Sequence, residues 1–428
     1  MRNLARKIVP ALVLVALTAS CGGGDTETDP EAEGGTDPSA EETTEGAPAR
    51  GNADLVVWTD ALKLEGVKAV ADKFAETNGI TVEVQAVSTD LQTNFVTANS
   101  ANNGPDVVVG AHDWIGNLVQ NGAIQPLQLT PDQLAGYSEK AVQATTYDGQ
   151  LYGVPYGIEA IALYRNTDVA PDEPATMDAA IAAGEAAVKA KKVDSALNLP
   201  VGELGDAYHM QPILTSMGGY LFGYDPATGY DASDLGIGQA GSLAAAKKIS
   251  ELGKAKVLRS SISGDNSIAL FTEGKAAFLV SGPWALADVK ESGIPYAIQP
   301  VPGFKGQQPA EPFMGAQAFM VASNAQNAAF AQQFVSGSDG VNSEESMQTL
   351  YETTTLPPAM IAVQESVDDP DIALFAEAAN KGAPMPAIPE MAAVWEPLGK
   401  AYAAIVGGAD PTKTMKSAGT TISGAIGG

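Results

Sequence analysis

The sequence predicts an α/β protein with two lobes. Between Leu55 and Val109, short apolar runs alternate with helical segments, and this β-α-β-α-β order is typical of a mainly parallel sheet. The chain has 428 residues, which is too long for one ordinary core but long enough for two lobes. Hydrophobic residues make up 45% of the chain, so a large core can form. No low-complexity linker follows residue 50, so we expect several chain crossings between the lobes.

Local periodicity predicts the elements of the first half. Val67, Val70 and Phe74 recur at helical spacing, and Gly79 stands where a helix commonly ends. The run that follows alternates apolar and polar residues, as a half-buried strand does. The predicted elements are a strand at 55–58, a helix at 65–78, a strand at 80–85, a helix at 91–100 and a strand at 107–109.

Later segments are less regular. The run 152–159 is extended but interrupted by Gly and Pro, so we expect it to bend near the end of an element. Residues 224–234 are rich in Asp with Gly, Pro and Ser, a composition that predicts turns. A helix is expected at 241–258, and a strand at 276–280 that leads to Trp284.

The N-terminus predicts export. A basic segment precedes the apolar run 8–17, and small residues follow, which is the pattern of a secretory signal peptide. Residues 17–21, Leu-Thr-Ala-Ser-Cys, resemble a bacterial lipoprotein processing site. We therefore expect cleavage of the signal peptide 1–20 and lipidation of Cys21. The alternative is an ordinary cleaved signal with a spare thiol, because a single Cys forms no internal disulfide.

Residues 22–50 predict a disordered tether. They carry nine acidic residues and no aromatic residue, so they cannot bury enough surface to fold, and self-repulsion extends them. The formal net charge of the whole chain is −27. This argues against nucleic acid and anionic phosphate as partners, which require clustered Lys and Arg. A lipid anchor at Cys21, a disordered tether and a large folded domain together predict a protein held at the outer face of the cell membrane.

The stretch GAHDW, at 110–114, places a histidine, a carboxylate and a large aromatic ring directly after a buried strand. Ligands of parallel sheets lie beyond the C-terminal ends of the strands, so this stretch predicts the edge of a binding crevice. Two histidines and one cysteine do not provide a zinc-binding pattern, and no GxSxG nucleophile motif is present. We expect neither a metal nor a cofactor.

Four stretches together form a recognisable pattern: GPDVVVGAHDWIGNLVQNGAIQPL (104–127), LYGVPYGIEAIALYRNTDV (151–169), FTEGKAAFLVSGPWA (271–285) and PMPAIPEMAAVW (384–395). In their order and spacing they resemble the maltose-binding protein family, the solute-binding components of sugar ABC transporters. The resemblance runs from Leu55 almost to the C-terminus and implies a two-lobed, periplasmic-binding-protein-like fold that closes about a hinge. The implied solute-binding domain is 51–428, with lobe 1 at about 55–157 and 313–366 and lobe 2 at about 158–312 and 367–428.

The resemblance also implies a set of ligand-binding residues. Carboxylates accept hydrogen bonds from sugar hydroxyls, and aromatic rings cover the apolar faces of sugars. Asp113, Glu159 and Asp206 match family carboxylates. The complete expected set is Asp60, Lys63, His112, Asp113, Glu159, Asp206, Tyr208, His209, Trp284, Met385, Trp395 and Glu396.

Several of these residues have a simpler structural interpretation. Asp113 also suits a helix N-cap, and Asp206 suits a loop acid beside a packed tyrosine. His112 equally suits a buried histidine whose nitrogens are satisfied by protein groups. Met385 suits plain core filling.

Four positions depart from the family. Gly110 stands in place of a tryptophan, which predicts that one aromatic wall is missing and that space is left for a different or larger sugar. Trp114 and Gly399 replace basic residues, and Glu396 replaces a tyrosine. The subsite around Trp395 is therefore expected to differ in detail.

The resemblance implies a monomeric extracytoplasmic lipoprotein that delivers maltose or maltodextrin to an ABC transporter permease and is not an enzyme. The departures leave open another oligosaccharide, such as trehalose or a cyclodextrin. A secreted carbohydrate-active enzyme is a further alternative, because Asp113, Glu159 and Asp206 could serve as a glycosidase acid and nucleophile.

Overall fold

A computed structural model describes residues 48–225 and 229–427. The expected signal peptide, Cys21 and nearly all of the expected tether lie outside these residues. Arg50, the last residue of that tether, is fixed to the folded part. Its guanidinium donates to the Asp106 carboxylate at 2.7 Å and to the Gly104 carbonyl at 2.9 Å. Arg50 is therefore part of the folded domain, which was expected to begin at residue 51.

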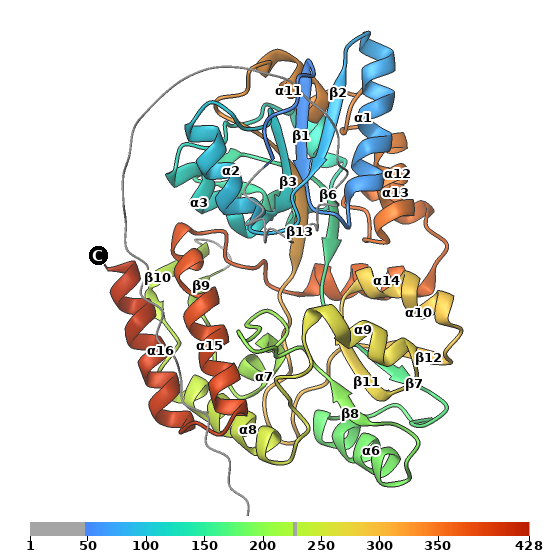
Figure 1. Cartoon of the computed structure of the whole chain (residues 1–428), viewed down its shortest axis with the longest axis vertical. Coiled ribbons are helices and arrows are strands. Elements are labelled where there is room, and N and C mark those ends of the chain that lie inside the picture. Colours follow the sequence, from blue (N-terminus) through green and yellow to red (C-terminus); the bar gives the residue numbers. More distant parts are fainter. Residues whose placement is uncertain (1–47, 226–228, 428) are drawn as a thin grey trace, which may run out of the picture. The chain divides into compact units, whose positions relative to one another are not determined.

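The first sheet has five strands in the order β2-β1-β3-β13-β6 (Figure 1). β1 pairs in parallel with β2 and β3, whereas β13 runs antiparallel to both β3 and β6. The predicted α/β class is confirmed, and β13 is the strand of this sheet that departs from parallel pairing. The strands are β1 Leu55–Thr59, β2 Val82–Ala86, β3 Val107–Ala111, β6 Val154–Glu159 and β13 Gly315–Val321.

Helices cover both faces of the first sheet, because alternate strand side chains point to opposite sides. Val57 packs in one core with Phe74, and Trp58 packs in a second core with Phe95. The helices of this lobe are α1 Leu64–Asn78, α2 Leu91–Ser100, α3 Ile115–Gln120, α4 Pro131–Ala135, α5 Glu139–Ala144, α11 Ala328–Ser336, α12 Glu344–Thr354 and α13 Ile361–Ser366. A two-stranded ribbon joins β4 Thr146–Tyr147 to β5 Gln150–Leu151.

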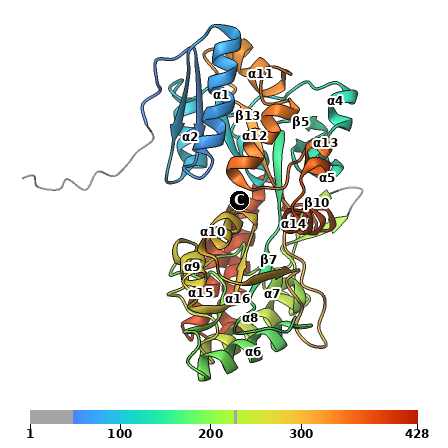
Figure 2. The ribbon, with the colours of Figure 1, turned by 90° about the vertical axis from the view of Figure 1, so that its right-hand side faces the viewer.

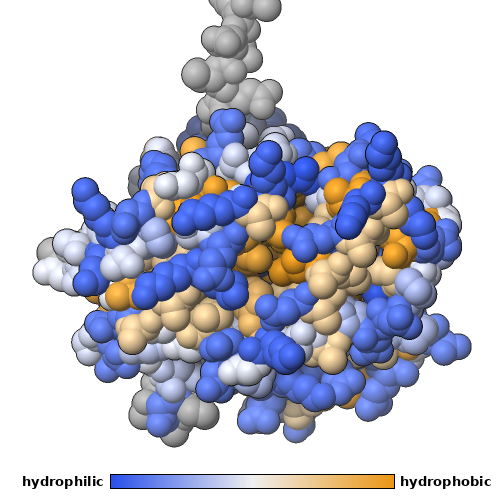
Figure 3. Space-filling view, turned by 90° about the horizontal axis from the view of Figure 1, so that it is seen from below, coloured by the Kyte–Doolittle hydropathy of each residue, from blue (hydrophilic) through white to orange (hydrophobic). Residues whose placement is uncertain are grey.

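The second sheet has four strands in the order β12-β7-β11-β8, and helices again lie on both faces. Its strands are β7 Ala162–Asn166, β8 Ser195–Asn198, β11 Ala276–Ser281 and β12 Tyr296–Gln299. Its helices include α6 Met177–Lys189, α7 Gln211–Ser216, α8 Ala240–Lys254, α9 Gly264–Thr272 and α10 Leu286–Ser292. Seen from the end where α6 and α8 lie, apolar side chains gather between hydrophilic ones (Figure 3).

The chain passes between the two sheets more than once, as the absence of a linker predicts. Residues 160–161 lead from β6 to β7, and residues 300–314 return from β12 to β13 (Figures 1 and 2). Helix α14, Pro370–Lys381, contacts both cores. Its Phe375 packs with the second sheet, and its Ala379 packs with the first.

The C-terminal helices pack on the second lobe. Leu398 and Ile405 of α15 share one core with Ile249 of α8. These last elements are the short 3₁₀ helix η3 Pro389–Ala393, α15 Trp395–Val406 and α16 Pro411–Ile426. The segment that resembles the family near Trp395 is thus part of the second lobe's core.

One segment predicted as turns forms a strand pair instead. β9 Phe222–Asp225 pairs antiparallel with β10 Gly229–Leu235. The rings of Tyr224 and Tyr230 face each other across the pair, with centroids 4.6 Å apart. Such cross-strand aromatic contacts favour a strand pair despite a polar composition.

Candidate functional site

The C-terminal ends of β1, β3 and β6 meet at one edge of the first sheet and deliver the predicted acidic residues there. β1 is followed by Asp60, β3 by Asp113 in the 3₁₀ helix η1 His112–Trp114, and β6 ends at Glu159. The strand β13 begins at the same edge, where Gly315 pairs with Glu159. The structure therefore brings these carboxylates together, as the strand order predicts.

Glu159 is buried, and burial is the main reason that its pKa is raised. Three neighbours favour its charged form: the positive charge of Lys63, a hydrogen bond from the Gln317 amide at 3.2 Å, and, more weakly, His209. Lys63 in turn forms an ion pair with Asp60. Gln317 is a site residue that the sequence reasoning missed. It lies at no quoted motif, and only the antiparallel strand β13 places it here.

Asp113 is also buried, and burial raises the pKa of its carboxyl group to about 7. The side chain of Trp395 is within hydrogen-bonding reach and opposes this shift, whereas the negative charge of Glu159 adds to it. Helix α3 begins without a side-chain cap, so Asp113 is not used as the N-cap that its position also suggested.

His112 has a structural role. Its side chain is fully buried, the Ala316 amide donates to its Nδ1 at 3.0 Å, and its Nε2 lies 3.0 Å from the Met385 carbonyl. Because Nδ1 accepts, the proton is on Nε2, which donates to that carbonyl. Burial lowers the pKa of His112 to about 4 and keeps the ring neutral. Both nitrogens are used by the backbone, so the structure favours the buried, satisfied histidine over a ligand contact.

A row of aromatic rings lies on the second lobe's side of this region. Tyr208 stacks on Phe313 with ring centroids 6.2 Å apart, and its ring lies 6.3 Å from that of Trp284. Trp395 meets Phe313 edge-on at 6.2 Å. Phe313, which sequence reasoning missed, links two predicted rings. It lies in the crossing before β13, where no periodicity marks it.

The hydroxyl group of Tyr208 is buried and has no hydrogen-bond partner within the described part of the chain. Burial raises the pKa of Tyr208 well above its ordinary value, and the nearby charges of Glu159, Asp206 and Asp113 raise it further. A buried hydroxyl without a partner is costly. Its position among three carboxylates marks a place where a ligand hydroxyl would find both donors and acceptors.

Asp206 and His209 form a local pair beside this row. The Asp206 carboxylate accepts from the His209 amide at 2.8 Å and lies 2.7 Å from its Nδ1. The loop that carries this pair packs directly on α15: a Cβ atom added to Gly205 would overlap the carbonyl of Gly399. The close approach explains the glycine at position 205, whereas a Cβ atom added to Gly399 would lie 3.2 Å from the Gly205 carbonyl oxygen, a tight contact.

Two expected residues do not present a polar side chain to this cluster. Met385 is buried in the core, and its amide donates to the Met314 carbonyl at 2.9 Å. The side chain of Glu396 is 74% exposed, forms an ion pair with Lys400, and borders a groove between α15 and α16. The structure does not bring the carboxylate of Glu396 to the predicted site.

The expectation that Gly110 leaves open space is wrong. A Cβ atom added to Gly110 would overlap the six-membered ring of Trp114. The indole thus lies directly on the glycine and fills the volume that a side chain at position 110 would take. Spacing along the chain could not show this, because it depends on how η1 folds back over β3.

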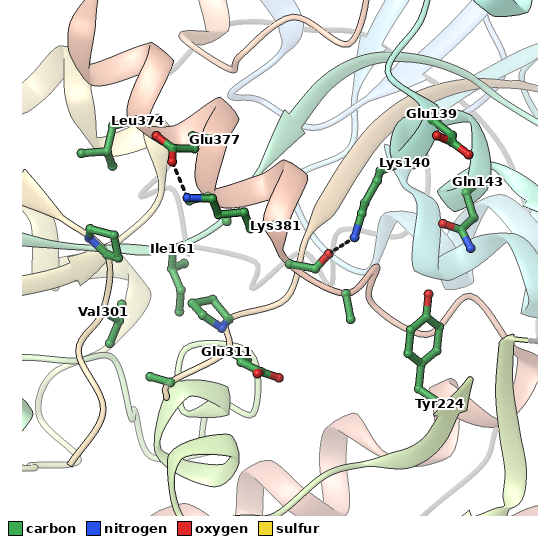
Figure 4. Close-up of a pocket in the computed structure, with 17 residues that line it drawn as sticks. Glu139, Lys140, Gln143, Ile161, Tyr224, Val301, Glu311, Leu374, Glu377 and Lys381 are labelled. Atoms are coloured by element: carbon green, nitrogen blue, oxygen red, sulfur yellow. Dashed lines mark hydrogen bonds and ion pairs between the residues drawn. The ribbon is translucent and has the colours of Figure 1, made fainter. Parts of the chain in front are cut away.

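A cavity of about 990 Å³ in the described part of the chain lies apart from this cluster. Residues of α5, β9, α14 and the crossing 300–312 line it, including Lys140, Tyr224, Glu311 and Lys381 (Figure 4). Lys140 donates to the Gly382 carbonyl at 2.6 Å. None of the predicted ligand-binding residues lines this cavity.

Neither a metal centre nor a membrane helix is found in the part of the chain that the structure describes. No group of three or more His, Cys, Asp or Glu side chains there has the arrangement of a metal site. No helix within 48–225 or 229–427 is long and apolar enough to cross a bilayer.

Two α/β lobes joined by repeated crossings, with carboxylates and aromatic rings gathered at the strand ends, define a two-lobed binding protein. A family model described as bacterial extracellular solute-binding protein matches residues 69–380, and the chain belongs to this family. The resemblance inferred from the sequence is confirmed at the level of the family.

Individual relatives are similar over nearly their whole length. The galactooligosaccharide-binding protein of Bacillus subtilis (strain 168) is 29% identical over 390 residues, which cover 87% of this chain and 90% of the relative. The maltodextrin-binding protein of the same organism is 28% identical over 360 residues, covering 82% and 84%. A maltooligosaccharide ABC transporter solute-binding lipoprotein of Streptococcus pneumoniae (strain ATCC BAA-255 / R6) is 24% identical over 377 residues, covering 86% and 88%.

Proposed function

We propose that this protein binds an oligosaccharide, of the maltodextrin type, and presents it to the permease of an ABC transporter. The observation that carries the proposal is the buried, unpartnered hydroxyl of Tyr208, in the described part of the chain, among the carboxylates of Asp113, Glu159 and Asp206. Sugars supply hydroxyl groups that both donate and accept. Carboxylates accept such bonds strongly, and the adjacent rings of Trp284 and Trp395 suit the apolar faces of a sugar.

Binding would couple to closure of the lobes. Asp113 and Glu159 come from the first lobe, while Tyr208 and Trp284 come from the second. Cross-lobe contacts already exist here, such as that between the Thr355 hydroxyl and the Pro283 carbonyl at 3.0 Å. A sugar held by both sides stabilises the closed arrangement and shifts the equilibrium toward it.

Galactooligosaccharide is the second candidate ligand, because a relative that covers 87% of this chain is named for binding it. Maltodextrin is supported by two relatives named for maltodextrin or maltooligosaccharide and by the four quoted motifs. The chemistry of carboxylates and rings suits either sugar, so the choice depends on measurement.

The export features extend the proposal. Residues 1–20 would be removed, Cys21 would carry the lipid, and the acidic segment 22–50 would tether a monomeric binding domain outside the membrane. A relative named as a solute-binding lipoprotein supports the anchor. Retention of labelled fatty acid by the native protein, and its loss in Cys21→Ser, would test this part.

The primary experiment is a calorimetric titration of the purified protein with maltose, maltotriose, galactotriose, trehalose and a cyclodextrin. Saturable binding of maltotriose is expected. Tyr208→Phe should weaken this binding about tenfold, because the hydrogen bond between the buried Tyr208 hydroxyl and the sugar is lost. Tyr402→Phe is the matched control, since its hydroxyl is likewise buried without a partner in the described residues but lies in the α15 core. Binding of none of these sugars would overturn the proposal.

The enzyme alternative gains one observation, the raised pKa of the Asp113 carboxyl group, which is a property of general acids in glycosidases. Burial in a site that excludes water gives the same shift without catalysis. Incubation of maltoheptaose with the protein and analysis for shorter products separates the two. Saturable binding without product supports transport.

A further inference from the structure

Gln317 is the one residue of β13 that carries a polar side chain. The strand reads GAQAFMV, and all of its residues are buried, Gln317 itself with only 8% of its surface exposed. Burying an amide group is unfavourable unless its donor and acceptor ends find hydrogen-bond partners. An apolar side chain would fill the same volume without this cost, so the glutamine has a role beyond packing.

Only one end of this amide has a partner among the described residues. Its nitrogen donates to Oε1 of Glu159 at 3.2 Å. Its oxygen is buried and has no hydrogen-bond partner within the described part of the chain. The opposite orientation of the amide would set two acceptors against each other, so the bond to Glu159 determines which end is free. Because both ends belong to one planar group, the free oxygen lies beside the same carboxylate.

The pairing of β13 with β6 brings the amide to the carboxylate (Figure 1). Gln317 lies opposite Gly157. Glu159 lies opposite Gly315, and a Cβ atom there would come within 2.6 Å of the glutamate side chain. Because both cross-strand partners are glycines, neither places a side chain between the amide and the carboxylate.

The ladder is irregular at this point. Gln317 pairs with β6 at residue 157, but Ala318 already pairs with Pro155, which leaves Tyr156 as the extra residue of a β-bulge. The Tyr156 carbonyl instead accepts from the Ala359 amide at 3.0 Å. Bulges re-aim side chains and are common beside binding and active sites.

The carboxylate that Gln317 contacts faces groups of both lobes. The residues whose charge acts on Glu159, or on which its charge acts, are Asp60, Lys63, Asp113, Tyr208 and His209. The free amide oxygen therefore lies next to the group around which the proposed sugar-binding residues gather.

We propose that Gln317 positions the sugar with both ends of its amide: the nitrogen holds the Glu159 carboxylate in place, and the oxygen accepts a hydroxyl group of the sugar unit that Glu159 binds. This inference rests on the proposed sugar-binding function. Adjacent ring hydroxyls can donate to a carboxylate and to an amide oxygen that lie side by side. A purely structural role would satisfy Glu159 but would leave the amide oxygen unpaired.

The test is titration calorimetry of the unchanged protein and of Gln317→Leu with maltose, maltotriose, galactotriose, trehalose and a cyclodextrin. The sugar that the unchanged protein binds most tightly should bind Gln317→Leu about tenfold more weakly, because both hydrogen bonds of the amide are lost. Denaturant unfolding of each variant shows that the folded protein is the species titrated.

Gln299→Leu is the matched control. Gln299, on β12, is equally buried, and its amide oxygen likewise has no partner within the described residues. Its nitrogen, however, donates to the Pro174 carbonyl at 3.0 Å and not to a carboxylate. Its substitution should therefore leave the sugar affinity unchanged, whatever it does to the stability.

Gln317→Glu tests the two hydrogen bonds with little change of shape. A protonated carboxyl group at this position can donate to Glu159 and still offer a free oxygen, whereas an ionised one repels Glu159. At pH 6 this variant should bind the preferred sugar more tightly than Gln317→Leu does. Its affinity relative to the unchanged protein should fall at higher pH, as both carboxyl groups become ionised.

Equal affinity of Gln317→Leu and the unchanged protein for the preferred sugar would overturn the inference, and so would an equal loss in Gln299→Leu. A Gln317→Glu variant that binds no better than Gln317→Leu at pH 6 would also overturn it. In each of these cases the sugar-binding function itself stands. If the unchanged protein binds none of the five sugars, the proposed function fails, and the inference fails with it.

Discussion

Replacing Asp113 by Asn should stabilise the ligand-free protein at pH 8 and weaken sugar binding. In the folded protein, burial raises the pKa of this carboxyl group to about 7 from its ordinary 3.8. Ionisation of Asp113 is therefore less favourable in the folded protein than in the unfolded chain, and this lowers the stability of the folded protein. Asparagine has nearly the same shape, carries no charge, and can still accept a hydrogen bond from Trp395.

The size of the effect follows from the shift. A difference of roughly three pH units corresponds to about 4 kcal/mol at pH 8, where the carboxyl group is ionised in both states. The cost shrinks as the pH falls below 7, is about 2 kcal/mol at pH 5, and vanishes below the ordinary pKa near 4. The extra stability of the Asp113→Asn variant over the unchanged protein should follow the same course.

Denaturant unfolding of both proteins at pH 8, 5 and 3.5 measures this difference. Glu396→Gln is the matched control: it removes the same charge from an exposed side chain outside the cluster and should change little at any pH. Asp113→Asn should also weaken maltotriose binding about tenfold, since a neutral amide accepts hydroxyl hydrogen bonds less strongly. A variant that is less stable at pH 8, or whose stability difference does not depend on pH, would refute the reasoning.

Three further predictions concern other contacts. His112→Ala leaves the Ala316 amide and the Met385 carbonyl unpaired in the interior, so it should destabilise the protein by about 2–4 kcal/mol in denaturant unfolding; an unchanged midpoint would contradict this. Arg50→Ala leaves the buried Asp106 carboxylate without its counter-ion and should lower the free energy of unfolding by about 3 kcal/mol. For the same reason, a chain that lacks residues 1–50 should unfold at a lower denaturant concentration than one that lacks residues 1–47. Sugar hydroxyls that donate to the Asp113 carboxyl group, whose pKa is about 7, favour its ionised form, so binding near pH 6.5 should release protons. Calorimetry in buffers of different ionisation enthalpy measures the number of protons released, and proton uptake would contradict the expected contact.

The first lobe's secondary structure is largely determined by local sequence. The helix predicted at 65–78 spans Leu64–Asn78, and the one predicted at 91–100 matches α2. These elements are set by apolar periodicity and by stop signals such as Gly79, which adopts a left-handed conformation at the end of α1. The pairing of Tyr224 with Tyr230 across β9 and β10 depends on contacts between separate segments, and there composition alone predicts turns.

The chemistry of the site could be predicted from the sequence, because carboxylates and aromatic rings stand at strand ends in GAHDW, at Glu159 and at Trp284. Their exact partners could not. Only the tertiary structure shows that both nitrogens of His112 are occupied by backbone groups and that Phe313 joins the aromatic row. It alone shows that Trp114 covers Gly110. The physical reason is that residue type and periodicity are local properties, whereas hydrogen-bond partners and the packing of one ring on another depend on segments brought together by the fold.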